Sequence, residues 1–189
     1  MLKPQDVVVL CKLVSLEAPQ VPIHRLAAEL KMSPSEVHHA IHRGVEARLV
    51  EVVEHRTLAH EKRVNRAALL ELCLTGLKYV FPVQPLSHAR GMPTGWAAPM
   101  LHGAEAHPGA LPPVWPTADG PVTGVAVPPL YRCVPEVARR DPTFYALMAA
   151  VDALRTRCPR ASRNAEVTLI SLLGTPRAVP APPRQVAVL

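Results

Sequence analysis

The stretch LAAELKMSPSEVHHAI, residues 26–41, contains the signals that decide the fold of this chain. Its central Ser33-Pro34-Ser35-Glu36 is a capping box with proline at the first helical position, so a helix is expected to begin there. Val37, Ile41 and Val45 recur every four residues and predict the buried face of that helix. The leucines and alanines before the box favour another helix, so the stretch predicts two helices joined by a tight turn.

Apolar patterns on both sides of this stretch extend the prediction. A helix is expected to begin after Pro4, where proline suits the first turn, and to end before Pro19. The alternating residues after the capped helix suit a short hairpin with a polar turn over residues 55–60. The expected order is therefore the helix after Pro4, a helix over residues 22–31, the helix after Ser33, a strand over residues 49–53 and a returning strand over residues 61–64.

Three helices followed by a hairpin resemble the winged helix-turn-helix family. In this resemblance Ala27 is the small residue where the two helices cross, and Met32 is the apolar residue of the turn. Ser33 caps the second helix, which in this family is the recognition helix and is called the reading helix below. Lys31 departs from the family pattern, which usually has glycine there. Since a left-handed turn residue is easiest for glycine, Lys31 implies mild strain or an altered turn.

The remainder of the chain is organised by proline. More than half of its 22 prolines fall between Pro82 and Pro135, a region that cannot hold a long helix. We therefore predict a mainly α fold with a small β-hairpin wing: an N-terminal winged helix-turn-helix, a proline-rich irregular region, and C-terminal helices. The expected units are residues 1–66, 67–135 and 136–189. Within them we expect a helix over residues 66–80, one strand over residues 122–127, helices over residues 141–155 and 162–173, and an extended tail.

Three further blocks resemble MarR-type regulators of similar length. They are RAALLELCLTGLKYVFP, HARGMPTGWAAPML and PLYRCVPEVARRDPTFYALMAAVDALR. There is also a weaker similarity to antitoxin-like regulators paired with nucleotidyltransferase toxins. The resemblance implies a transcription regulator that binds double-stranded DNA, most simply as a homodimer, and it leaves open a toxin as a partner protein.

The candidate DNA-binding residues follow from the predicted helix faces. A winged helix places its third helix in the major groove, where hydroxyl, imidazole and guanidinium groups reach base edges or phosphates. Cations of the wing suit phosphate contacts, and the formal net charge of +6 permits such a role. The predicted contacts are Ser33, Ser35, His38, His39, His42 and Arg43 on the helix, with Arg56, Lys62, Arg63 and Arg66 on the wing.

The three histidines also allow a metal site. His38 and His42 are four residues apart, a spacing that lets two imidazoles share one zinc ion. No third ligand lies nearby in sequence, whereas zinc usually takes at least three protein ligands, so we expect no metal and no cofactor. Histidines that face DNA would instead strengthen phosphate contacts as the pH falls.

The loop over residues 88–101 groups Arg90, Thr94 and Trp96. It could form an effector pocket or dock the C-terminal part, or it could be a packed loop in which Trp96 and Trp115 fill the core. No nucleophile–base pair, glycine-rich phosphate loop or paired carboxylates can be recognised in the sequence, so we do not expect an enzyme.

The C-terminal helices carry apolar faces that suit either the core or a dimer interface. The arginines near them could contact the DNA backbone or an acidic partner, or be a solvated face: Arg155, Arg157, Arg160 and Arg163. The alternative function is an antitoxin-like interaction module that neutralises its partner through this region. No apolar run of about 18 residues occurs, the first residues turn polar at once, and the cysteines form no CxxC pair, so we expect a cytoplasmic protein without a membrane span.

Overall fold

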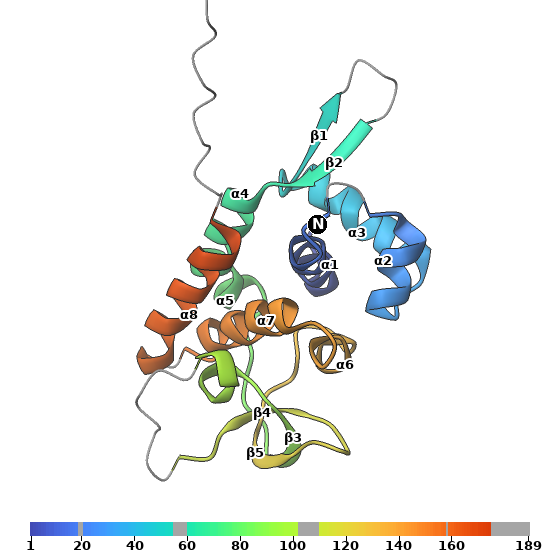
Figure 1. Ribbon diagram of the computed structural model, residues 1–189. Coiled ribbons are helices and arrows are strands. Elements are labelled where there is room, and N and C mark those ends of the chain that lie inside the picture. Colours follow the sequence, from blue (N-terminus) through green and yellow to red (C-terminus); the bar gives the residue numbers. More distant parts are fainter. Residues whose placement is uncertain (19–20, 55–59, 102–109, 158, 175–189) are drawn as a thin grey trace, which may run out of the picture.

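The computed structural model describes residues 1–18, 21–54, 60–101, 110–157 and 159–174 (Figure 1). These residues form a mainly helical protein with one two-stranded and one three-stranded sheet. The N-terminal elements match the expected order of three helices and a hairpin. They are α1 (Pro4–Ser15), α2 (Ile23–Leu30), α3 (Pro34–Glu46), β1 (Val50–Glu54) and β2 (His60–Val64).

The capping box begins α3 as the sequence predicted. The Ser33 hydroxyl accepts a hydrogen bond from the Glu36 amide at 3.2 Å, and the Glu36 carboxylate accepts one from the Ser33 amide at 2.9 Å. Lys31, at the end of α2, has φ 52° and ψ 41°, the left-handed conformation expected for this turn. Two amide groups of the turn donate to α2 carbonyls, which satisfies the end of that helix.

The hairpin is antiparallel and in a regular register. Val50 lies opposite Val64, and Val52 lies opposite Lys62. Val50 is buried, while Val52 and Lys62 are exposed. Residues two apart on a strand point to the same face, so the hairpin is buried at the end nearest the helices and exposed farther out. The turn at residues 55–59 lies outside the described residues.

The helix expected over residues 66–80 is present, with an irregularity in its middle. It comprises α4 (Arg66–Glu71), a segment of π-helical hydrogen bonding, η1 (Leu72–Gly76), and α5 (Leu77–Val80). Its inner face buries Leu69, Cys73 and Leu77. Asn65 caps α4 by accepting a hydrogen bond from the Ala68 amide at 2.9 Å.

The proline-rich region is more regular than predicted, which corrects the expectation of a largely irregular segment. The strands β3 (His88–Pro93), β4 (Pro113–Pro116) and β5 (Val122–Ala126) form a sheet in which each strand pairs with the other two. The prolines lie at or near the strand ends, where ladder hydrogen bonds are least disturbed. Glycine is required where the chains approach closely, because a Cβ at Gly124 would lie 1.9 Å from the Pro112 carbonyl oxygen.

The C-terminal part is helical and contains the centre of the core. Its elements are α6 (Val134–Ala138), α7 (Pro142–Arg155) and α8 (Pro159–Leu173), with two short 3₁₀ turns, η2 (Gly95–Ala97) and η3 (Pro99–Leu101), packed near them. Figure 1 shows α7 between the N-terminal helices and the three-stranded sheet, with α8 along one side. From Phe144 to Arg155, every residue of α7 is buried, so one hydrophobic core runs from α1 to α8.

A buried carboxylate joins α7 to the sheet. Asp152 is fully buried and accepts hydrogen bonds from Trp115 Nε1 at 2.5 Å, Thr94 Oγ1 at 3.3 Å and Arg155 NH1 at 2.5 Å. Arg155 also donates from Nε to the carbonyl of Phe81 at 2.9 Å. Arg155 therefore belongs to the interior, which corrects the expectation that it lies in an arginine-rich surface run. Trp115 fills the core, as the packed-loop alternative predicted, whereas Trp96 is only partly buried. Thr94 is buried beside Asp152.

Within the described parts of the chain, no helix combines the length and the apolar character needed to cross a membrane.

Candidate nucleic-acid interface

Helix α3 has one buried and one exposed face. Val37, Ala40, Ile41 and Gly44 are buried against the other helices and the hairpin. A Cβ at Gly44 would lie 2.9 Å from the Val50 side chain, so this glycine lets the hairpin approach α3 closely. The opposite face is exposed and polar, and it carries Ser35, His38, His39, His42 and Glu46.

The exposed side chains are loosely connected to one another. Ser35 Oγ lies 3.3 Å from His39 Nδ1, and the rings of His38 and His39 meet edge to face with centroids 5.7 Å apart. His42 Nδ1 lies 3.3 Å from Glu46 Oε1. These contacts are local, one turn apart at most, so the imidazoles remain accessible to a ligand that lies along the helix.

Unlike the other predicted DNA contacts of α3, Ser33 is the N-cap residue that precedes the helix. Its hydroxyl is used in the capping box, where it donates to Glu36 Oε2 at 2.8 Å and accepts from the Glu36 amide. It is exposed, so its place at the start of α3 is compatible with a backbone contact, but its first role is structural.

Arg43 is turned away from the exposed face. Its Nε and NH2 donate to the two carboxylate oxygens of Asp6 at 2.8 Å and 2.6 Å, and these hydrogen bonds raise the pKa of the guanidinium. Asp6 belongs to α1 and is fully buried. The sequence singled out Arg43 as a group for guanine or phosphate, but its Nε–NH2 edge, one of the edges that can make a bidentate contact, is occupied by a partner 37 residues away. We therefore place Arg43 among the residues that position α3.

The DNA contacts predicted for the hairpin also differ in their exposure. Lys62 and Arg63 are exposed on β2, close to α3. Arg66 is half-buried and donates from NH1 to the Leu172 carbonyl of α8 at 3.1 Å, so it joins the start of α4, just after the hairpin, to the C-terminal helix. Arg56 lies outside the described residues.

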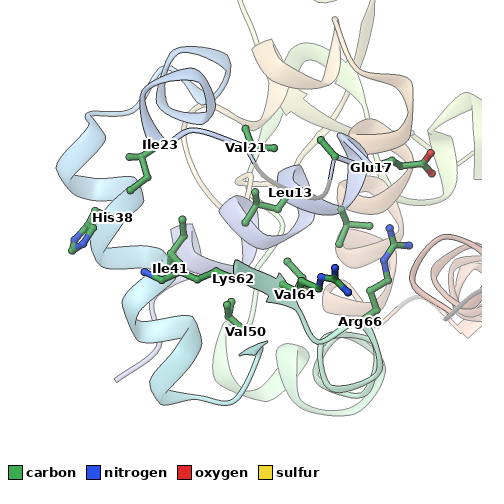
Figure 2. Close-up of a pocket in the computed structure, with 13 residues that line it drawn as sticks. Leu13, Glu17, Val21, Ile23, His38, Ile41, Val50, Lys62, Val64 and Arg66 are labelled. Atoms are coloured by element: carbon green, nitrogen blue, oxygen red, sulfur yellow. The ribbon is translucent and has the colours of Figure 1, made fainter. Parts of the chain in front are cut away.

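A pocket of about 540 Å³ opens between α1, α3 and β2 (Figure 2). Aliphatic side chains line most of it, among them Leu13, Val21, Ile41 and Val64, while charged or polar groups contribute the rest of the lining. In Figure 2 these polar groups are seen to come from different elements: His38 from α3, and Lys62 from β2, with Glu17 and Arg66 farther along the opening. The pocket thus separates the exposed face of α3 from the hairpin cations.

The side of α3 away from the hairpin contacts a segment that is distant in sequence, residues 131–136. Tyr131 donates its hydroxyl hydrogen to Glu36 Oε1 at 3.0 Å, and Lys31 forms an ion pair with Glu136 of α6. The hydrogen bonds from Ser33 and Tyr131 lower the pKa of Glu36, so that carboxylate stays ionised. This contact could not be predicted from the sequence, because its partners are 95 residues apart and the capping box accounts for Glu36 without it.

In the described parts of the chain, no three His, Cys, Asp or Glu side chains group as a metal site. Cys11 and Cys73 are buried, and burial raises the pKa of Cys73 to about 12. Such a thiol stays protonated and is a poor nucleophile near neutral pH.

No known family profile matches the chain, and neither a curated protein nor a solved structure is significantly similar to it. The geometry of α3 and the segments on its flanks therefore carries the functional interpretation.

Proposed function

We propose that this chain is a transcription regulator that binds double-stranded DNA sequence-specifically through a winged helix-turn-helix. In this proposal α3 lies in the major groove and the β1–β2 hairpin is the wing that contacts phosphates. The observation that carries the proposal is the exposed polar face of α3, which no described segment covers and which Lys62 and Arg63 of the hairpin flank.

The chemistry of this face suits base edges. The major groove is about 12 Å wide and admits an α-helix, and each base pair presents there its own pattern of donors and acceptors. Ser35, His39 and His42 can donate or accept, depending on the hydroxyl rotamer and the imidazole tautomer. Their side chains project from the first three turns of α3, which has 13 residues, so they can follow several successive base pairs.

The hairpin would contribute affinity for DNA rather than sequence specificity. Lys62 and Arg63 are exposed on β2, and cations in such positions release counterions from the DNA backbone. Two rigid contacts would hold the reading helix in place: the Asp6–Arg43 pair and the capping box at Ser33. We also propose a homodimer, because helix-turn-helix proteins commonly read two half-sites related by a two-fold axis.

The antitoxin-like alternative has less support from the contacts of the C-terminal helices. The apolar face that would bind a partner protein is largely buried inside the chain, including Phe144, Leu147 and Val151 of α7 and Leu169 of α8. Of the predicted apolar face, a toxin could reach only the exposed part, such as Val167 and Ile170 of α8.

A mobility-shift experiment tests the proposal. The wild-type protein selects duplexes from a random-sequence library, and the selected duplex is then titrated with His39→Ala, Lys62→Ala and a control, His88→Ala. His88 is an exposed histidine on β3, in the other sheet. We expect His39→Ala to lose discrimination between the selected and a scrambled duplex, Lys62→Ala to weaken binding to both alike, and His88→Ala to match the wild type. Failure of the wild type to select or shift any duplex would rule out the proposal.

A further inference from the structure

The segment around Tyr131 and Arg132 lies against the reading helix, although it is far from it in sequence. Tyr131 contacts Glu36 in the first turn of α3 through its hydroxyl group, at 3.0 Å. The Arg132 guanidinium lies over the Tyr131 ring, 5.7 Å from its centroid. The positive charge of Arg132 also helps to lower the pKa of Glu36, which is consistent with a position beside the start of α3.

This segment and the hairpin occupy opposite flanks of the exposed face of α3. At 3.6 residues per turn, two residues correspond to about 200°, so Glu36 and His38 point to opposite sides of the helix. His38 lines the pocket beside β2, whereas Glu36 contacts Tyr131. The exposed Ser35, His39 and His42 lie between these flanks.

Arg132 differs from its basic neighbours in its partners. Arg139 makes two hydrogen bonds to Asp119, at 2.5 Å and 2.6 Å, and both Lys31 and Arg140 pair with Glu136. Arg132 is exposed, and in the part of the chain that the structure describes its guanidinium has no carboxylate in ion-pair contact. Its stacking on Tyr131 orients the side chain while leaving its donors available to an anion.

We propose that Arg132 is a further DNA-binding residue, which contacts a backbone phosphate on the side of the major groove opposite the wing. This inference rests on the proposed DNA-binding function. A helix in the major groove has a phosphate backbone on each side, so a reading helix is held most firmly when both of its flanks carry cations. Lys62 and Arg63 supply one flank, and Arg132 supplies the other from outside the helix-turn-helix. Tyr131 is a positioning residue in this arrangement.

The salt dependence of binding tests the inference. The affinity for the selected duplex and for a scrambled duplex is measured by fluorescence anisotropy at several salt concentrations, for the wild type, Arg132→Ala, Arg132→Lys and Arg140→Ala. Each phosphate contact contributes about 0.9 to the slope of log affinity against log salt. We expect Arg132→Ala to reduce this slope by about one on both duplexes, and Arg132→Lys to keep most of it.

Arg140→Ala is the matched control, since it removes the same charge from an exposed arginine that pairs with Glu136. Its slope should equal that of the wild type. An unchanged slope for Arg132→Ala would overturn the inference while the wild type still binds DNA. Equal losses for both alanine variants would also overturn it, because they would reflect net charge alone. Absence of DNA binding by the wild type would instead mean that the proposed function fails, and the inference with it. Thermal melting of each variant confirms that it is folded.

Discussion

Arg43 of α3 and Asp6 of α1 form a two-point ion pair, with Nε–Oδ2 and NH2–Oδ1 distances of 2.8 Å and 2.6 Å. The Asp6 side chain is fully buried and that of Arg43 is 18% exposed. The pair therefore fixes the orientation of α3 relative to α1, and removing it should first lower the stability of the fold.

We expect Arg43→Ala to lower the free energy of unfolding by about 3 kcal/mol, because breaking a buried pair leaves an uncompensated charge in the interior. Urea denaturation measures the loss. Arg25→Ala, at a site where the side chain is 60% exposed, should change stability by less than about 0.5 kcal/mol. A variant Arg43→Ala that is as stable as the wild type but defective in DNA binding would show that Arg43 contacts DNA directly, as the sequence first suggested.

A second ion-pair network joins α7 to the first two helices and predicts a pH dependence of stability. The almost fully buried Lys12 ammonium lies 2.7 Å from Asp141 and 2.8 Å from Glu29, and Ser15 donates to Asp141 at 2.6 Å. Burial by itself raises the pKa of Asp141, but the hydrogen bonds from Lys12, the Phe144 amide and Ser15 outweigh it, so the net pKa is lowered.

A lowered folded pKa means that the carboxylate contributes stability above its unfolded pKa of about 3.9, and that this contribution is lost as the pH falls through the folded pKa. We therefore expect the stability advantage of the wild type over Asp141→Asn to be constant near neutral pH and to shrink below about pH 4. Urea denaturation between pH 3 and pH 7 measures it. Asp119→Asn, which removes an exposed carboxylate, should show a smaller change. An advantage that grows on acidification would contradict the assignment.

The elements that could be predicted from sequence are those with local signals. The capping box at Ser33, the left-handed Lys31 and the helix that begins after Asp141 each depend on residues within about one turn of one another, so the pattern alone locates them. In the three-stranded sheet only β5 has a sequence signal, since the strand predicted over residues 122–127 is present as Val122–Ala126. The other two strands, β3 and β4, are short and end in proline. They pair across more than twenty residues, so only the folded chain reveals the pairing.

The candidate site divides in the same way. The periodicity of Val37 and Ile41 correctly places His39 and His42 on the exposed face. It does not show that Arg43 is within reach of Asp6, or that Tyr131 contacts Glu36 on the side of α3 away from the hairpin. Both facts depend on contacts between residues far apart in sequence, and periodicity carries no information about such partners.

The exposed apolar residues of α8 provide a test of the proposed homodimer. Val167 and Ile170 are 62% and 52% exposed and lie three residues apart, so they form one patch on the helix. We expect the wild type to have twice the chain mass of 20.5 kDa in light scattering, and Ile170→Asp to be monomeric. Leu86→Asp, at an apolar residue exposed to a similar degree, should stay dimeric. A monomeric wild type, or an Ile170→Asp variant that remains dimeric, would exclude this interface.

The histidines of α3 predict that DNA affinity rises as the pH falls from 8 to 6 at fixed ionic strength. Histidine gains its charge in this range, and a charged donor forms a stronger hydrogen bond to phosphate than a neutral one, by about 1 kcal/mol or roughly fivefold.

The measurement is fluorescence anisotropy on the selected duplex with His38→Asn/His39→Asn, His42→Asn and the control His88→Asn. We expect the double variant and His42→Asn each to lose part of the pH dependence, and the control to lose none. A wild type whose affinity is equal at pH 6 and pH 8 would mean that these imidazoles read DNA in the neutral form, since the hydrogen bonds of neutral imidazole do not depend on the proton concentration in this way.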